Sequence, residues 1–133
     1  MEQEESRLVL DTYQSLLNKV YNLLDEAQIK RIVEKLRMAK RVYVCGRGSS
    51  GLAAEEMATR FRWIGIDMVA LRDNENIKMQ SVFLNPQNLV IGLSLSGTKS
   101  EVLYMLARGC RQGADTILIT EKTESHTKTF AGK

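Results

Sequence analysis

The sequence is poor in the residues that build metal sites. It has one histidine, His126, and two cysteines, Cys45 and Cys110, which are far apart and form no CxxC pair. It also has no HExxH motif. A structural zinc site needs a cluster of such ligands, so no metal and no cofactor is expected. The cysteines fall in an expected strand and on an expected helix face, which predicts buried free thiols in a reducing compartment.

Long apolar runs are also absent. No stretch approaches the length of a membrane-spanning helix, and the acidic N-terminus lacks the apolar core of a signal peptide. We therefore expect a soluble cytoplasmic protein without membrane contact. The net charge of +3 is too small by itself to indicate nucleic-acid binding.

The composition suits one globular domain over residues 1–133, with 44% hydrophobic and 26% charged residues. Short apolar runs alternate with stretches of helical periodicity. Strands are expected at about 41–46, 68–71, 89–93 and 116–120. Helices are expected at 6–24, from 25 to about 40, and at about 51–63, 75–84 and 98–112, followed by a polar tail at 121–133.

This alternation predicts an α/β fold, a three-layer αβα sandwich around a parallel sheet. The expected strand order is 2-1-3-4, as in flavodoxin-like folds. Residues 41–120 form the βα core. Residues 1–40 form two N-terminal helices that pack outside it or against another chain.

Sequence signals also mark helix ends and buried faces. Asp25 and Asp73 are typical N-caps, and Gly65 and Gly113 are typical of the residue after a helix C-terminus. The second helix has a basic face, which we interpret as a solvated surface because no aromatic or base-reading residues accompany it. Its apolar face, expected to be buried, consists of Ile29, Ile32, Val33 and Leu36.

The turn after the first expected strand carries the strongest functional signal, because a helical pattern begins directly after it. Gly46, Gly48 and Gly51 let the backbone turn tightly and approach a ligand, while Ser49 and Ser50 add hydroxyl donors. A helix N-terminus offers free N–H groups and a positive dipole end, so this turn is typical of half of a phosphate site.

A second turn of this kind follows the third expected strand. Strands 1 and 3 are neighbours in the order 2-1-3-4, and such folds bind ligands in the crevice outside their carboxyl ends. Both turns therefore open onto one crevice that suits a phosphate dianion, and removing one serine should weaken binding roughly tenfold or more. The candidate ligand-binding residues of this turn are Ser94, Ser96, Gly97 and Thr98, with Lys99 as a source of direct charge.

Two other interpretations stay open at this point. Glycine and serine at strand-to-helix turns are often plain turn and cap residues. Gly46-x-Gly48-x-x-Gly51 also matches the dinucleotide fingerprint, with Asp73 as the ribose acid. A nicotinamide cofactor, however, leaves the second serine turn unexplained.

With both motifs in view, the chain resembles a known family. Gly46-Arg47-Gly48-Ser49-Ser50-Gly51 and Ser94-Leu95-Ser96-Gly97 are similar to the motifs of the sugar isomerase (SIS) domain, a phosphosugar-binding fold. Over about residues 10–125 the sequence resembles the effector domain of the RpiR family of sugar-responsive transcription regulators. The resemblance implies that Ser50 and the second turn hold a sugar phosphate, and that Glu101 is the family's acidic residue in the following helix.

The chain departs from the family pattern in two respects. Lys99 stands where the family commonly has a phosphate-binding threonine, and Thr98 lies one position earlier. The family also continues with a further strand and a C-terminal helix, and its regulators carry an N-terminal helix-turn-helix; none of these is expected within this sequence. It therefore resembles an excised or shortened sensor domain.

Binding and catalysis are the two alternatives that follow from the resemblance. An isomerase needs a base beside the sugar carbonyl, but His126 lies in the polar tail, and Glu55 and Glu101 lie on helices where surface charge is the commoner role. We therefore favour a ligand-binding sensor domain, with a sugar-phosphate isomerase subunit as the main alternative. The apolar stripe of the first helix predicts a homodimer, as SIS domains use such helices, and no direct nucleic-acid contact is expected.

Overall fold

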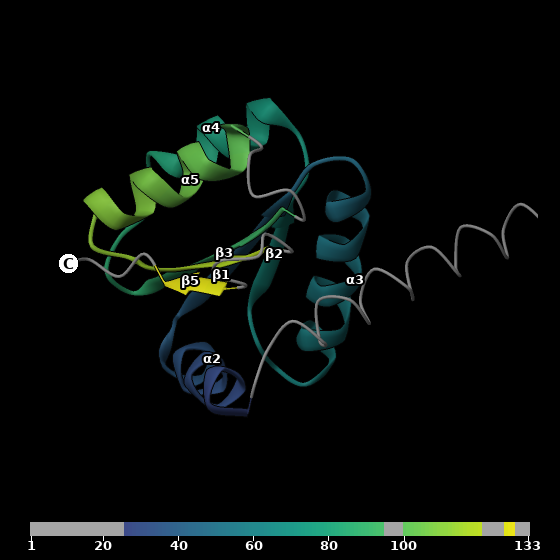
Figure 1. Ribbon diagram of the computed structural model, residues 1–133, viewed down its shortest axis with the longest axis vertical. Helices are drawn as coiled ribbons and strands as arrows, with labels where there is room; N and C mark the ends of the chain where they lie inside the picture. Colours follow the sequence, from purple (N-terminus) through teal and green to yellow (C-terminus); the bar gives the residue numbers. More distant parts are fainter. Residues whose placement is uncertain (1–25, 95–99, 121–126, 130–133) are drawn as a thin grey trace, which may run out of the picture.

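The computed structural model describes residues 26–94, 100–120 and 127–129 (Figure 1). The helix expected at residues 6–24 and the Asp25 cap lie outside the described residues. Within the described part, no helix is both long enough and apolar enough to cross a bilayer.

Four parallel strands form the centre of the fold, as the sequence predicts. They are β1 (Arg41–Gly46), β2 (Met68–Leu71), β3 (Asn88–Leu93) and β4 (Asp115–Ile119). In space they follow the order β2-β1-β3-β4, which confirms the expected topology. Cys45 near the end of β1 pairs with Leu71 of β2 and with Gly92 of β3, so the carboxyl ends of these strands share one edge of the sheet.

The polar tail expected at residues 121–133 contains a strand that the sequence does not predict. β5 (Thr127–Thr129) pairs antiparallel with β4, with Thr127 opposite Ile119 and Thr129 opposite Ile117. Threonine suits an edge strand, but three polar residues carry no apolar alternation that would signal one. The parallel sheet therefore ends in a short antiparallel edge.

Helices cover both faces of the sheet and complete the predicted three layers (Figure 1). One face carries α2 (Glu26–Met38) and α3 (Ser49–Trp63), and the other carries α4 (Asn74–Ser81) and α5 (Ser100–Arg111). The helix starting points differ slightly from the expected ones, since α3 begins in the serine pair of the turn itself. This early start brings both serines into the first helical turn.

Strand β1 separates the two cores by the alternation of its side chains. Val42 and Val44 pack with α2 and α3, whereas Tyr43 and Cys45 pack with α4 and α5. All four side chains are buried, as expected for a central parallel strand. Burial raises the pKa of the Cys45 thiol to about 12, so this free cysteine is an inert core residue; Cys110 is only half-buried.

Two details of the helices test the sequence signals. Gly65 and Gly113 end α3 and α5 as predicted, with the paired backbone bonds of the Schellman motif. On α2, Leu36 is buried and Ile32 packs beside it, but Val33 is 42% exposed and does not belong to the buried face. The helix contacts the sheet through one narrow stripe, and Val33 lies beyond its border.

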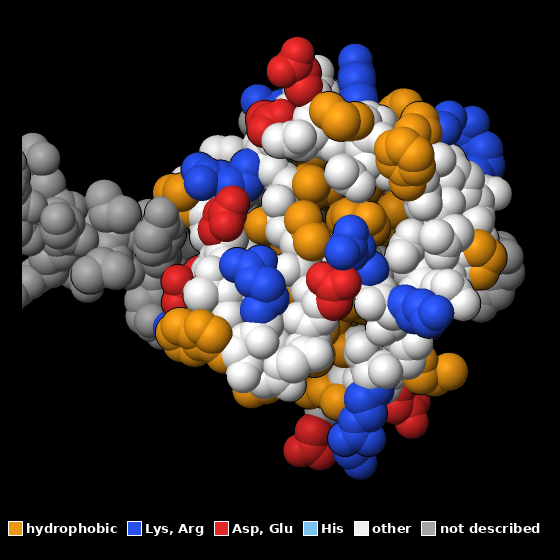
Figure 2. All heavy atoms as spheres, turned by 180° about the vertical axis from the view of Figure 1, so that it is seen from behind, with side chains coloured by type: hydrophobic (Ala, Val, Ile, Leu, Met, Phe, Trp, Pro, Cys, Tyr) orange, Lys and Arg blue, Asp and Glu red, His pale blue; other side chains and the backbone are white. Residues whose placement is uncertain are grey.

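The face turned away from the viewer in Figure 1 shows how charge is distributed. Lys and Arg side chains alternate with Asp and Glu across it, and apolar side chains lie between them (Figure 2). Among the described side chains, no stripe of one sign crosses this face, which agrees with the small net charge of the chain.

Candidate functional site

The turn after β1 is held by two glycines that touch each other's backbone. A Cβ on Gly46 would lie 2.6 Å from the Ser50 carbonyl oxygen, and a Cβ on Gly51 would lie 2.9 Å from the Gly46 carbonyl oxygen. Real Cβ atoms do not approach backbone so closely. The end of β1 and the first turn of α3 are therefore packed directly on one another, and only glycine permits this.

Gly48 opens the helix in a conformation that other residues avoid. It is the N-cap of α3, with φ 58 and ψ −129, and no side chain caps the helix there. The N–H groups of Ser50 and Gly51 bond to the Arg47 carbonyl oxygen at 3.1 and 3.3 Å. Among the described residues, the Ser49 N–H and the hydroxyls of Ser49 and Ser50 have no hydrogen-bond partner.

An uncapped helix start with unused donors has a defined chemical use. The free N–H groups and the dipole both favour a negative charge placed at the N-terminus. Ser49 is exposed and Ser50 is half-buried, so their hydroxyls can face a ligand at the surface. This geometry fits an anion better than it fits an apolar or cationic group.

The second turn begins beside the first, as the strand order predicts. Gly46 pairs with Leu93, the last residue of β3, so Ser94 follows at the same edge of the sheet. Ser94 is buried, and its N–H donates to the Ile119 carbonyl oxygen at 3.1 Å. The structure therefore brings Gly46, Gly48, Ser49, Ser50 and Ser94 to one edge. The predicted residues Ser96, Gly97, Thr98 and Lys99 lie outside the described residues.

Thr120 is a neighbour of Ser94 that the sequence does not single out. Ile119 pairs with Leu93, so Thr120 stands next to Ser94 at the end of β4. Its side chain is buried. A threonine that closes an apolar strand gives no functional signal by itself, and only the register places it at this edge.

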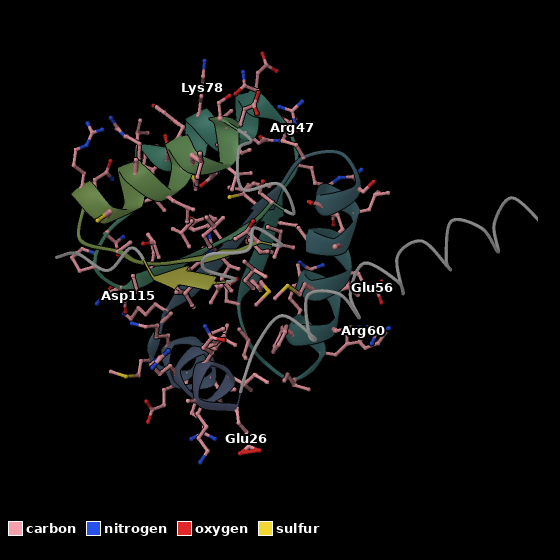
Figure 3. The ribbon with its side chains drawn as sticks, viewed as in Figure 1. Glu26, Arg47, Glu56, Arg60, Lys78 and Asp115 are labelled. Atoms are coloured by element: carbon pink, nitrogen blue, oxygen red, sulfur yellow. The ribbon has the colours of Figure 1, made fainter. Side chains whose placement is uncertain are left out.

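Arg47, the residue between Gly46 and Gly48, supplies a positive charge at the turn. Its Nη1 lies 3.3 Å from Oε2 of Glu101, and both side chains are about one third exposed, at 34% and 29%. Figure 3 shows Arg47 at the end of the sheet, between the start of α3 and the layer formed by α4 and α5. The expected site residue Glu101 thus lies near the first turn, where it pairs with an arginine to which the sequence assigns no role.

Asp73 serves as the cap of α4 rather than as a free acid. Its Oδ1 accepts a hydrogen bond from the Asn76 N–H at 2.8 Å, and its Oδ2 accepts one from the Asn76 side-chain amide at 2.8 Å. The bond from the Asn76 N–H is the main reason that the pKa of Asp73 is lowered, and nearby Arg47 lowers it further. With both oxygens engaged, the cap role is favoured over ribose binding.

The candidate bases and metal ligands are spread apart. Glu55 is exposed on α3, Glu101 is paired with Arg47, and His126 lies outside the described residues. Within the described ranges, no group of three His, Cys, Asp or Glu residues is arranged to hold a metal ion. The described edge is therefore equipped for anion binding by backbone N–H groups, hydroxyls and the guanidinium groups of Arg47 and Arg72; Arg72 Nε would lie 3.4 Å from a Cβ on Gly51.

The chain is similar to known proteins over most of its length. A family model described as the SIS domain matches residues 35–132. An uncharacterized HTH-type transcriptional regulator of Haemophilus influenzae is 31% identical over 117 residues, covering 88% of this chain and 41% of the relative. Another from Clostridium perfringens is 28% identical over 125 residues, covering 88% and 44%. The chain thus spans about two fifths of the length of these curated relatives.

Several solved structures share the fold, among them two with a TM-score of 0.73. One is the RpiR transcription factor from Sphaerobacter thermophilus (sugar isomerase domain), with a TM-score of 0.73, 24% identity, and coverage of 90% of this chain and 68% of that chain. The other is the Vibrio vulnificus NanR protein complexed with ManNAc-6P, with a TM-score of 0.73, 21% identity, and coverage of 90% and 46%. At these identities the likeness shows the fold alone.

Proposed function

The chain belongs to the SIS-domain family, and on that premise we propose that it is the phosphosugar-binding sensor domain of a sugar-responsive transcription regulator. The observation that carries the proposal is the uncapped N-terminus of α3, built by three glycines at the edge where β1 and β3 end. The HTH-type regulators among the relatives and the sugar-phosphate complex of the NanR protein support it.

The phosphate is proposed to sit against the first turn of α3. There it would accept hydrogen bonds from the Ser49 N–H and the Ser50 hydroxyl, which have no other partner in the described part of the chain. Ser94, Ser96, Gly97, Thr98 and Lys99 are proposed to close the site from the β3 side. Hydrogen bonds to a charged group contribute about 1.5–3 kcal/mol each, so each serine matters.

Thermal unfolding with a panel of sugar phosphates, inorganic phosphate and NAD tests the proposal. A ligand of the folded state at about 100 times its Kd adds about 2.7 kcal/mol of stability and raises the midpoint. Ser50→Ala should weaken binding roughly tenfold, which leaves about half of that shift at the same concentration. Thr59→Ala is the matched control, because the Thr59 hydroxyl bonds within α3 to the Glu55 carbonyl oxygen, away from the turn.

The outcomes separate the alternatives. A shift with one sugar phosphate that Ser50→Ala reduces and Thr59→Ala preserves supports the site. A shift with NAD alone supports the dinucleotide interpretation, and no shift with any compound contradicts the proposal. Turnover of an aldose phosphate to a ketose phosphate would favour the isomerase, in which Glu101 or Glu55 is the candidate base.

The remaining parts of the proposal concern assembly. Residues 1–133 are proposed to act as one domain in the cytoplasm, as a homodimer through the N-terminal helices. The exposed Val33 on α2 supports an apolar contact there. Sedimentation as a monomer at micromolar concentration would contradict the dimer. DNA contact is assigned to parts of a regulator outside this sequence, and a salt-dependent shift of duplex DNA by this chain would contradict that assignment.

A further inference from the structure

The ion pair of Arg47 and Glu101 connects the glycine turn with α5. Arg47 lies in the turn after β1, directly before the uncapped helix start, and Glu101 lies in the first turn of α5. Their side chains approach to 3.3 Å and stay partly exposed. The guanidinium therefore belongs to a residue of the candidate phosphate turn, and solvent can reach it.

The contacts of Arg47 leave it only one strong partner. Of the described acidic side chains, Glu101 alone lies within ion-pair distance of it. Asp73 is close enough to be influenced by its charge, but both Asp73 oxygens are engaged by Asn76. A partly exposed ion pair of this kind is weak, whereas a guanidinium binds phosphate through two parallel hydrogen bonds.

We propose that Arg47 is a phosphate-binding residue that Glu101 holds in the ligand-free state, and that the ligand phosphate replaces the Glu101 carboxylate on Arg47. This inference rests on the proposed function, since it needs an anion at the α3 N-terminus. The exchange leaves the guanidinium paired throughout, and it frees Glu101 to face the hydroxyls of a bound sugar. Ligand binding thereby removes the ion pair between the turn and α5.

Calorimetric titration with inorganic phosphate tests the exchange. Because this ligand has no sugar, contacts between Glu101 and sugar hydroxyls cannot affect the measured affinity. Arg47→Gln should weaken phosphate binding about tenfold, through the loss of a charged hydrogen-bond donor. Glu101→Gln should strengthen it by roughly two- to fivefold, because the phosphate no longer competes with an ion pair of ordinary strength. In an Arg47→Gln background, Glu101→Gln should give no such gain.

Glu56 and Arg60 provide the matched control. They form an ion pair of 2.7 Å on α3 itself, away from the turn. Glu56→Gln and Arg60→Gln make the same charge changes within α3, and both should leave phosphate affinity unchanged. Melting curves of all variants show whether each one is folded.

Four results would overturn the inference. If Arg47→Gln and Glu101→Gln both weaken phosphate binding, the pair has a structural role. If the gain from Glu101→Gln persists without Arg47, or appears equally in Glu56→Gln, it reflects a general loss of repulsion. If neither Arg47→Gln nor Glu101→Gln changes the phosphate affinity while Ser50→Ala lowers it, the proposed function stands and the exchange is wrong. If the unaltered chain binds neither phosphate nor a sugar phosphate, the proposed function and the exchange are both refuted.

Discussion

Replacing Gly46 with alanine should disable the site and destabilise the fold together. The new Cβ would lie 2.6 Å from the Ser50 carbonyl oxygen and 3.0 Å from the Gly51 nitrogen. Both are backbone atoms of the first turn of α3, so relief requires the helix start to move away from β1. We expect a loss of about 1–3 kcal/mol in the free energy of unfolding, as for other overpacked positions, and a loss of phosphate binding.

Gly109→Ala is the control for added volume alone. Gly109 lies near the C-terminal end of α5, and its Cβ would lie 3.1 Å from Cγ2 of Thr116 in β4 and 3.3 Å from Cγ2 of Val90 in β3, both side-chain atoms. These side chains can shift by a few tenths of an ångström, and alanine stabilises a helix by about 1 kcal/mol relative to glycine. The net change in stability should therefore be within about 1 kcal/mol, with phosphate affinity unchanged.

Circular dichroism during urea unfolding measures the effect on stability. Calorimetric titration with phosphate measures the effect on binding. Wild-type stability and affinity in Gly46→Ala would refute the reasoning, because they would show that the turn yields without strain. A destabilised Gly46→Ala that still binds phosphate at full affinity would show that the phosphate binds elsewhere. Loss of binding in Gly109→Ala would show that any packing change disables the protein.

Two further predictions rest on single residues. Asp73→Ala should lower the melting temperature at neutral pH, because it removes the cap of α4. Folding lowers the pKa of Asp73, so the carboxylate stabilises the folded protein at pH values above the ordinary aspartate pKa of about 3.9. This stabilisation is lost as the pH falls through the lower pKa of the folded state. A difference from wild type that grows below pH 3 would contradict this. Cys45 should resist iodoacetamide in the native protein at pH 8 and react in urea, since burial raises its pKa to about 12. Detection of a label on Cys45 in the native protein by mass spectrometry would contradict its burial.

The sequence predicts the core because local patterns determine it. The apolar run of β1, the helical period of α3 and the Gly65 and Gly113 stops are each visible within a few residues, and the structure confirms them. The prediction that Val33 is buried is wrong, because periodicity gives the direction of an apolar face but not its width. The sequence does not predict β5 (Thr127–Thr129), because an edge strand forms through backbone pairing and needs no apolar pattern.

The site is predictable only in part, for a related reason. The turn glycines carry their own signal, since a close approach or a positive φ restricts the residue type. Arg47 carries none, because an arginine between two glycines is ordinary until the fold brings Glu101 to it. A contact between elements far apart in the sequence depends on register and helix placement, which local patterns do not specify. Ser96, Gly97, Thr98 and Lys99 stay predictions, since they lie outside the described residues.

The position of this ion pair bears on whether the site senses or catalyses. The helices α3 and α5 lie on opposite faces of the sheet, and the pair connects the turn of one with the first turn of the other. A sensor must convert ligand binding into a change between parts of the fold, and breaking such a contact does so. An isomerase instead needs a carboxylate kept in place beside the sugar carbon. Glu101→Gln therefore separates the two: it abolishes turnover if Glu101 is a base, and it raises phosphate affinity if Glu101 is the competitor of the ligand.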